Sequence, residues 1–255
     1  MQACGGGNIK DYTTYSFSVS EMIQTLLLGF FGSFFLLYLF YHHYITCFFG
    51  GVLGAVGYLF YQKHRLAQQQ KWKLMVEFKD AMDSMISALV AGYSMENAIG
   101  EAYHDMFLIQ GKETAMISEL RDIKAKLSLQ HTLDELLLDL GRRSGVEDII
   151  IFAQIYATAR RSGGNLVKVM KRTAENIGEK IEMQREIQTM ISGKKMEANC
   201  MMVIPLLIIL YLHICSPGFL DPLYGNFMGV LFMTVVLIVY MVSILWSRHI
   251  MNIQG

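Results

Sequence analysis

Almost all charges of this chain lie in one central segment. Between Lys63 and Glu197 lie 20 of the 22 Lys and Arg residues and 19 of the 22 Asp and Glu residues. Hydrophobic residues make up 53% of the 255 residues, and the mean hydropathy is +0.34. This apolar excess must lie in lipid or in a very large core. The formal net charge of zero gives no general attraction to polyanions, so nucleic acid is not expected as a partner.

The weakly charged ends contain apolar runs long enough to cross a bilayer, which takes about 17 to 25 residues. Four such runs cover residues 22–41, 45–61, 200–216 and 227–247. Only residues 42–44 separate the first two, so these form a tight hairpin, and the last two form a second hairpin. Gly50, Gly54 and Gly57 give the second run a small-residue face, which we expect to pack against the first run of the same hairpin rather than against another chain.

The positive charges indicate the side of the membrane on which each connection lies. Lys63 and Arg65 follow the second run, Lys194 and Lys195 precede the third, and Arg248 follows the fourth, whereas neither hairpin turn contains Lys or Arg. The spans contain no Asp, Glu, Lys or Arg, which disfavours an ion or proton transporter. The expected organisation is a cytoplasmic N-terminal tail (1–21), a first hairpin (22–61), a cytoplasmic domain (62–199), a second hairpin (200–247) and a cytoplasmic C-terminal tail (248–255).

The central segment is predicted to be helical throughout. It contains no proline, and its apolar residues recur at helical spacing, as at Leu74, Phe78 and Met82. We expect its last helix to run from Leu166 to about Asn199, directly into the third span. Helix breaks are expected at Gly92, at Gly111, around Gln130, at Gly145 and at Gly163-Gly164. The predicted fold class is therefore an all-α membrane protein, with four transmembrane helices in two hairpins and a cytoplasmic six-helix bundle inserted between them.

Three of these breaks resemble one another and are predicted to be helix-turn-helix elbows. Residues 89–99 align with residues 127–137, and residues 161–166 form a looser third copy. In each, a turn ends one helix and a polar side chain caps the next. The structural elbow residues are Gly92 and Ser94 in the first copy, Thr132 in a possible capping box in the second, and Gly163, Gly164 and Asn165 in the third. An anion could bind at the third elbow, but a plain capped turn is favoured.

No catalytic, cofactor or metal site is predicted. The seven His residues show no metal-binding spacing, the four Cys residues form no CxxC pair, and Gly193-Lys194 lacks the remainder of a phosphate-binding loop. We therefore expect a protein that is not an enzyme. His104-Asp105 is the kind of pair found on phospho-accepting helices, which leaves a membrane sensor or regulatory subunit with a helical cytoplasmic signalling domain as the alternative function.

Two segments carry a resemblance to a known family. Residues 88–98, ALVAGYSMENA, and residues 157–170, ATARRSGGNLVKVM, together with the flanking spans, resemble the type II secretion system F family. A single such domain between two pairs of spans is most similar to the inner-membrane platform proteins of Tad/Flp pili. The resemblance extends from about Lys71 to the C-terminus. One departure is Gln130, where the family often has Gly.

The resemblance implies a non-enzymatic platform in the bacterial plasma membrane that couples a cytoplasmic secretion ATPase to pilin assembly. The implied partners are that ATPase, pilin subunits, a paralogous platform protein or a second copy of the chain, and the lipid membrane. Candidate ATPase-binding residues are Arg142, Arg143, Arg160 and Arg161, two cationic pairs that could form a basic rim. Stabilisation of helix C-termini by these cations is the simpler explanation for both pairs.

Overall fold

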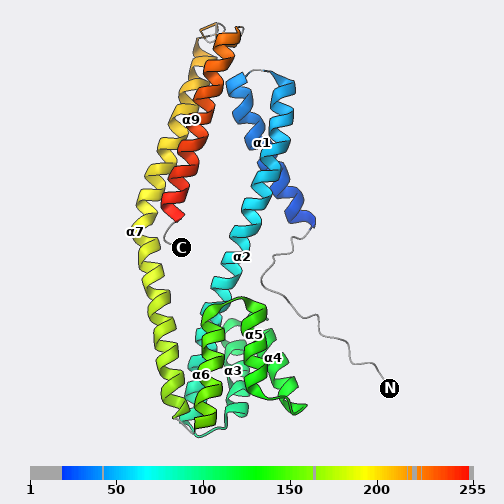
Figure 1. Cartoon of the computed structure of the whole chain (residues 1–255), viewed down its shortest axis with the longest axis vertical. Coiled ribbons are helices and arrows are strands. Elements are labelled where there is room, and N and C mark those ends of the chain that lie inside the picture. The colour runs from blue at the N-terminus through cyan, green and yellow to red at the C-terminus, as the bar shows by residue number, and fades with distance from the viewer. Residues whose placement is uncertain are drawn as a thin grey trace, which may run out of the picture. The chain divides into compact units, whose positions relative to one another are not determined.

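The computed structural model describes residues 19–41, 43–162, 165–216, 218–219, 223–224 and 226–252. Within these ranges the regular structure is entirely helical and comprises eight helices (Figure 1). They are α1 (Val19–Tyr41), α2 (Tyr44–Val90), α3 (Met95–Gln110), α4 (Ala115–Ser128), α5 (Leu133–Ser144), α6 (Glu147–Ser162), α7 (Leu166–Cys215) and α9 (Phe227–Asn252). The breaks predicted at Gly92, Gly111, Gln130 and Gly145 are confirmed by these bounds. The break predicted at Gly163-Gly164 lies outside the described residues.

The helices belong to two compact units. We call His64–Glu182 the helical unit, and the described residues of 17–63 and 183–255 the apolar unit. α2 and α7 each contribute to both units without a break, so the prediction that one helix runs from Leu166 into the third span is confirmed.

The apolar unit contains the four predicted spans. α1, α2, α7 and α9 are the helices among the described residues that are long and apolar enough to cross a membrane. The small-residue face of α2 packs on α1, because an added Cβ at Gly50 would overlap Leu37 and one at Gly54 would overlap Ser33. The expected packing within the first hairpin is thus confirmed at these two glycines. An added Cβ at Gly57 would meet no atom, so this glycine does not take part.

Polar contacts fix the other helices of the apolar unit to one another. The Tyr41 hydroxyl donates to Thr234 Oγ1 at 2.9 Å and joins α1 to α9. Tyr240 of α9 donates to the carbonyl oxygen of Met202 of α7 at 2.6 Å. An unpaired hydroxyl is costly inside an apolar layer, where no water can bond to it. Each of these two tyrosine hydroxyls has an acceptor on a neighbouring helix.

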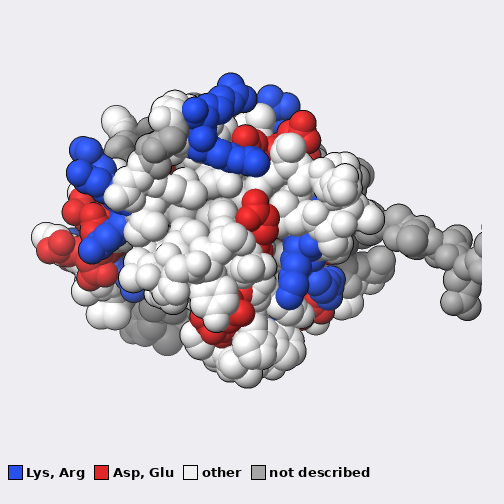
Figure 2. Space-filling view, turned by 90° about the horizontal axis from the view of Figure 1, so that it is seen from below, with Lys and Arg blue, Asp and Glu red and all other residues white. Residues whose placement is uncertain are grey.

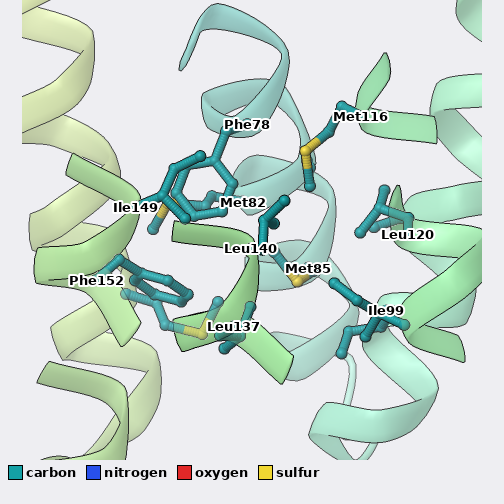
Figure 3. Packing of buried hydrophobic residues seen from close by; sticks show 14 of the residues in the cluster. Phe78, Met82, Met85, Ile99, Met116, Leu120, Leu137, Leu140, Ile149 and Phe152 are labelled. Atoms are coloured by element: carbon teal, nitrogen blue, oxygen red, sulfur yellow. The ribbon is translucent and has the colours of Figure 1, made fainter. Parts of the chain in front are cut away.

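The helical unit is held by a core in which side chains from all its helices meet (Figure 3). At its centre, the rings of Phe78 and Phe152 pack edge to face with their centroids 5.4 Å apart. Methionines fill the space around the aromatic rings, as their unbranched side chains allow. The buried residues labelled in Figure 3 are Phe78, Met82, Met85, Ile99, Met116, Leu120, Leu137, Leu140, Ile149 and Phe152. They recur every three or four residues along each helix, which is the spacing that the sequence showed.

Candidate functional site

The helix ends on one side of the helical unit lie close together. Asp134, in the first turn of α5, pairs with Arg160, in the last turn of α6, at 3.3 Å. Glu96, in the first turn of α3, acts electrostatically on the same guanidinium. The starts of α3 and α5 and the end of α6 are therefore neighbours. We call this side, with the connections at residues 90–94 and 129–132 and with Ser162 at the end of α6, the elbow end.

The first elbow has the geometry that the sequence predicts. Gly92 has φ +93°, a conformation that L side chains rarely adopt. An added Cβ at Gly92 would meet no atom within 4 Å, so backbone conformation rather than space requires a glycine here. Ser94 has an extended backbone and accepts a hydrogen bond from the backbone N–H of Asn97 at 3.3 Å. Gly92 and Ser94 are thus confirmed as the turn and the cap of α3.

The second elbow differs from the prediction at its cap. Thr132 occupies the N-cap position of α5 with an extended backbone, but its side chain makes no capping hydrogen bond. The predicted capping box is therefore wrong, and Thr132 contributes through its carbonyl oxygen, which accepts from Leu136 N–H at 3.2 Å. The turn itself uses Gln130 with φ +67°, the one non-glycine with positive φ among the described residues.

The third elbow is described on one side only. Asn165 Oδ1 accepts a hydrogen bond from the backbone N–H of Lys168 at 3.0 Å and caps α7 as predicted. Gly163 and Gly164 lie outside the described residues. The possible anion site at this elbow therefore stays a prediction.

The first cationic pair is divided between the unit's interior and its surface. Arg143 donates to both carboxylate oxygens of Glu119, at 3.0 and 2.7 Å, and to Asp139 at 2.8 Å. Its side chain is only 17% exposed and that of Glu119 only 6%. The hydrogen bonds to Glu119 raise the pKa of the Arg143 guanidinium above its ordinary value. Because it binds Glu119, Arg143 joins α5 to α4 and is a structural residue. Arg142, by contrast, is exposed.

The second cationic pair is exposed and lies at the elbow end. The hydrogen bond to Asp134 raises the pKa of Arg160 above its ordinary value, and Arg161 beside it is also exposed. Asp134 is eight residues from Arg142 along α5, about 12 Å at 1.5 Å per residue. The two pairs therefore lie toward opposite ends of the α5–α6 hairpin. The expectation of a single basic rim is wrong in its geometry, because consecutive antiparallel helices place their C-termini at opposite ends.

Exposed apolar side chains accompany the exposed cations at the elbow end. Val90 is 71% exposed, Tyr93 49% and Leu129 73%. Two of them lie in or beside the first elbow and the third in the second elbow, so none belongs to the core. Figure 2 shows one face of the molecule, on which separate groups of Lys and Arg and of Asp and Glu lie among uncharged surface. A surface that mixes exposed apolar residues with cations at its margin is typical of a protein-docking site.

A polar cavity of about 330 Å³ lies beside the first elbow. α3 and α4 form its walls, with Glu96, Glu101 and His104 on α3 and Lys124 on α4. The Lys124 ammonium lies 6.0 Å from the ring centre of Tyr103, within cation–π distance. The described residues contain no group of three or more His, Cys, Asp or Glu placed to hold a metal ion.

Sequence reasoning missed two buried carboxylates of the helical unit. Glu119 binds Arg143, and Glu77 of α2 accepts from the backbone N–H of Met116 at the start of α4. Both partners are distant in sequence. The one available signal is that each glutamate interrupts the apolar face of its helix at helical spacing. Glu77 lies three residues after Leu74 and Glu119 three residues after Met116, both of which are buried.

Comparison with known protein families gives a match to this chain. The family model described as Type II secretion system (T2SS), protein F, matches residues 81–214, just over half of the chain. The matched region begins in α2, includes α3 to α6 and ends near the C-terminus of α7. No curated protein and no solved structure shows a significant match to the chain.

Proposed function

The chain belongs to the type II secretion system protein F family, and we propose that it is the inner-membrane platform of a Tad-like pilus machine. Members of this family are non-catalytic platform proteins. In this role the chain couples a cytoplasmic secretion ATPase to the assembly of pilin subunits. The observation that carries the proposal is the family match to the region that includes the whole series α3 to α6 and ends inside a candidate span.

The arrangement of spans supports the Tad-like subtype. Two candidate spans lie before α3 and two after α6, so the matched region lies among two pairs of candidate spans. The charge distribution supports an orientation with both termini and the helical unit in the cytoplasm, because neither hairpin turn contains Lys or Arg. The cytoplasmic location would expose the elbow end to soluble partners.

We assign the ATPase contact to the elbow end. Arg161 supplies a positive charge without an ion pair among the described residues, and Val90, Tyr93 and Leu129 supply exposed apolar area. An acidic ATPase surface would be attracted by Arg161 over several ångströms, and apolar contact would then hold the complex. Arg142 and Arg143 are excluded from this contact, since they lie at the other end of α5.

The alternative, a membrane sensor or regulatory subunit, has less support. His104 does line the polar cavity beside the first elbow. However, Lys124 and two glutamates share that cavity, and the chain contains no recognisable nucleotide-binding partner domain. A phosphoryl group on His104 would therefore have no donor within this chain.

Co-purification tests the proposed function. The tagged full chain is extracted from membranes of its own cell with mild detergent, and the proteins that accompany it are identified. A platform would bring with it a secretion ATPase, a paralogous platform protein or a prepilin. A matched purification of an unrelated four-span protein sets the background. Recovery of a receptor or kinase instead, with no secretion component above background, would favour the sensor alternative.

A further inference from the structure

A cavity of about 610 Å³ lies within the apolar unit, between α7 and α9. Figure 1 shows these two helices running alongside each other, and the Tyr240 to Met202 hydrogen bond joins them. Lys194 lines the cavity from α7, and Val239, Val242, Ser243, Trp246 and Ser247 line it from α9. The cavity is thus lined by two joined helices rather than by one.

The polarity of the lining changes along the helices. Val239 and Val242 make an apolar wall inside the candidate span Phe227–Ser247. Ser243, Ser247 and Lys194 bring two hydroxyls and a cation toward the end of that span. A ligand that fits this lining must have an apolar chain at one end and an anionic, hydrogen-bonding group at the other.

The surroundings identify the ligand class. Both helices contain candidate membrane spans, so in a bilayer the apolar wall would lie against the lipid. Trp246 lies one residue from the end of its span and is 67% exposed, and Trp is enriched where the hydrocarbon meets the headgroups. Lys194 lies six residues before Cys200, where the third apolar run begins. Its long side chain is therefore close enough to reach the level of the headgroups.

Lys194 is available to an anion. Its side chain is 80% exposed and pairs with Glu197 at 3.0 Å, itself 53% exposed. Such exposed pairs are weak, so a phosphate that offers two or more oxygens can replace the carboxylate. Lys195 is also exposed but does not line the cavity. Consecutive helical residues point about 100° apart, so Lys195 provides a matched control of equal charge.

We propose that the cavity between α7 and α9 binds one anionic phospholipid, with its phosphate on Lys194 and the serine hydroxyls and an acyl chain along Val239 and Val242. The lipid holds the ends of the two spans together at the bilayer surface. Because the site lies in the apolar unit, it does not depend on the ATPase contact.

Fluorescence quenching of Trp246 tests the site. The chain has two Trp residues, so Trp72→Phe leaves Trp246 as the sole indole. The full chain is reconstituted in nanodiscs in which either phosphatidylglycerol or phosphatidylcholine carries brominated acyl chains, and the mole fraction of the brominated lipid is varied. We expect brominated phosphatidylglycerol to quench Trp246 at about fivefold lower mole fraction than brominated phosphatidylcholine does. This is the preference expected for one lysine at an anionic surface.

Four substitutions identify the group responsible. Lys194→Gln should abolish the preference, Lys194→Arg should keep it, and Glu197→Gln should strengthen it by removing the competing carboxylate. Lys195→Gln should leave it nearly unchanged. All three positions are exposed, and circular dichroism of each variant checks that helicity persists.

Equal quenching by the two brominated lipids would contradict the proposed site. Equal weakening of the preference for phosphatidylglycerol by Lys195→Gln and Lys194→Gln would also contradict it, because the effect would then be a general attraction of the lipid to the positively charged protein surface. Inorganic phosphate is added as a separate arm. Loss of the preference at millimolar phosphate would assign the site to a free anion and would likewise contradict a lipid ligand.

Discussion

Glu77 Oε2 accepts a hydrogen bond from the backbone N–H of Met116 at 3.1 Å. Glu77 is 4% exposed and lies on α2, whereas Met116 is in the first turn of α4, 39 residues later. The first N–H groups of a helix have no partner within the helix, and a carboxylate also interacts favourably with the positive end of the helix dipole. Glu77 thus completes a cap that Thr114 begins through its bond to Ile117 N–H at 3.4 Å.

Glu77→Ala should lower the free energy of unfolding of the helical unit by about 1 to 3 kcal/mol, because Met116 N–H would be buried without a partner. Glu77→Gln keeps an acceptor and should cost less. Thermal unfolding of the full chain in detergent, followed by circular dichroism, compares the two. An equal effect of both variants would show that charge rather than the hydrogen bond is decisive.

Arg143→Ala should be more damaging than any other single change among the four arginines. It removes the guanidinium that pairs with the buried carboxylate of Glu119, and removal of one member of a buried pair costs about 3 to 5 kcal/mol. Arg142→Ala, the adjacent exposed control, should change stability by less than about 0.5 kcal/mol. Similar stability of the two variants would show that the Glu119 contact contributes nothing.

Gly92→Ala should destabilise the first elbow through the backbone alone. An added methyl group meets no atom, so the expected cost of about 1 to 2 kcal/mol comes from the positive φ. The measurement is again thermal unfolding of the full chain. A neutral result would mean that the turn can adopt another conformation.

Gln130→Gly provides the opposite change at the second elbow. Because Gln130 already has φ +67°, glycine should relieve strain and stabilise the chain by up to about 1 kcal/mol. Glycine also gives the unfolded chain more conformational freedom, which reduces the gain in stability. Whether stability rises or falls is therefore the informative result. A clear destabilisation would show that the Gln130 side chain makes a contribution larger than its backbone strain.

The orientation is tested by reporters or single cysteines placed on each side. A probe between residues 216 and 226 should be extracytoplasmic, and one within residues 111–114 should be cytoplasmic, because the Lys and Arg residues flank the spans on the latter side. Membrane-impermeant thiol labelling of intact cells, with the native cysteines replaced, distinguishes the two. The reverse labelling pattern would contradict the orientation and place the helical unit outside the cytoplasm.

Local patterns were sufficient to predict much of the fold. Gly92, Ser94 and Asn165 act within one or two helical turns, so their roles follow from residue type and spacing alone. Uncharged runs likewise identified the candidate spans, because length and composition decide that property.

Tertiary relationships could not be predicted in the same way. The pairing of Arg143 with Glu119, and the cap that Glu77 gives to α4, depend on how the helices pack. Thr132 has the sequence of a cap but not its hydrogen bond, since a side-chain rotamer is not determined by spacing. The two arginine pairs looked equivalent in sequence. In the structure, however, Arg143 binds the buried Glu119, and the two pairs lie toward opposite ends of the α5–α6 hairpin.

Binding of the secretion ATPase to the full chain is the most direct test of the platform function. The chain is placed in nanodiscs, and ATPase binding is measured against empty nanodiscs over a range of salt concentrations, for the native chain and for Arg161→Glu and Arg142→Glu. We predict saturable binding to the native chain that weakens with salt, is reduced severalfold by Arg161→Glu at the elbow end, and is little changed by Arg142→Glu. Reduction by Arg142→Glu alone would move the contact to the other end of the helical unit. No binding above empty nanodiscs, by a chain whose helicity and membrane insertion are intact, would contradict the platform function itself.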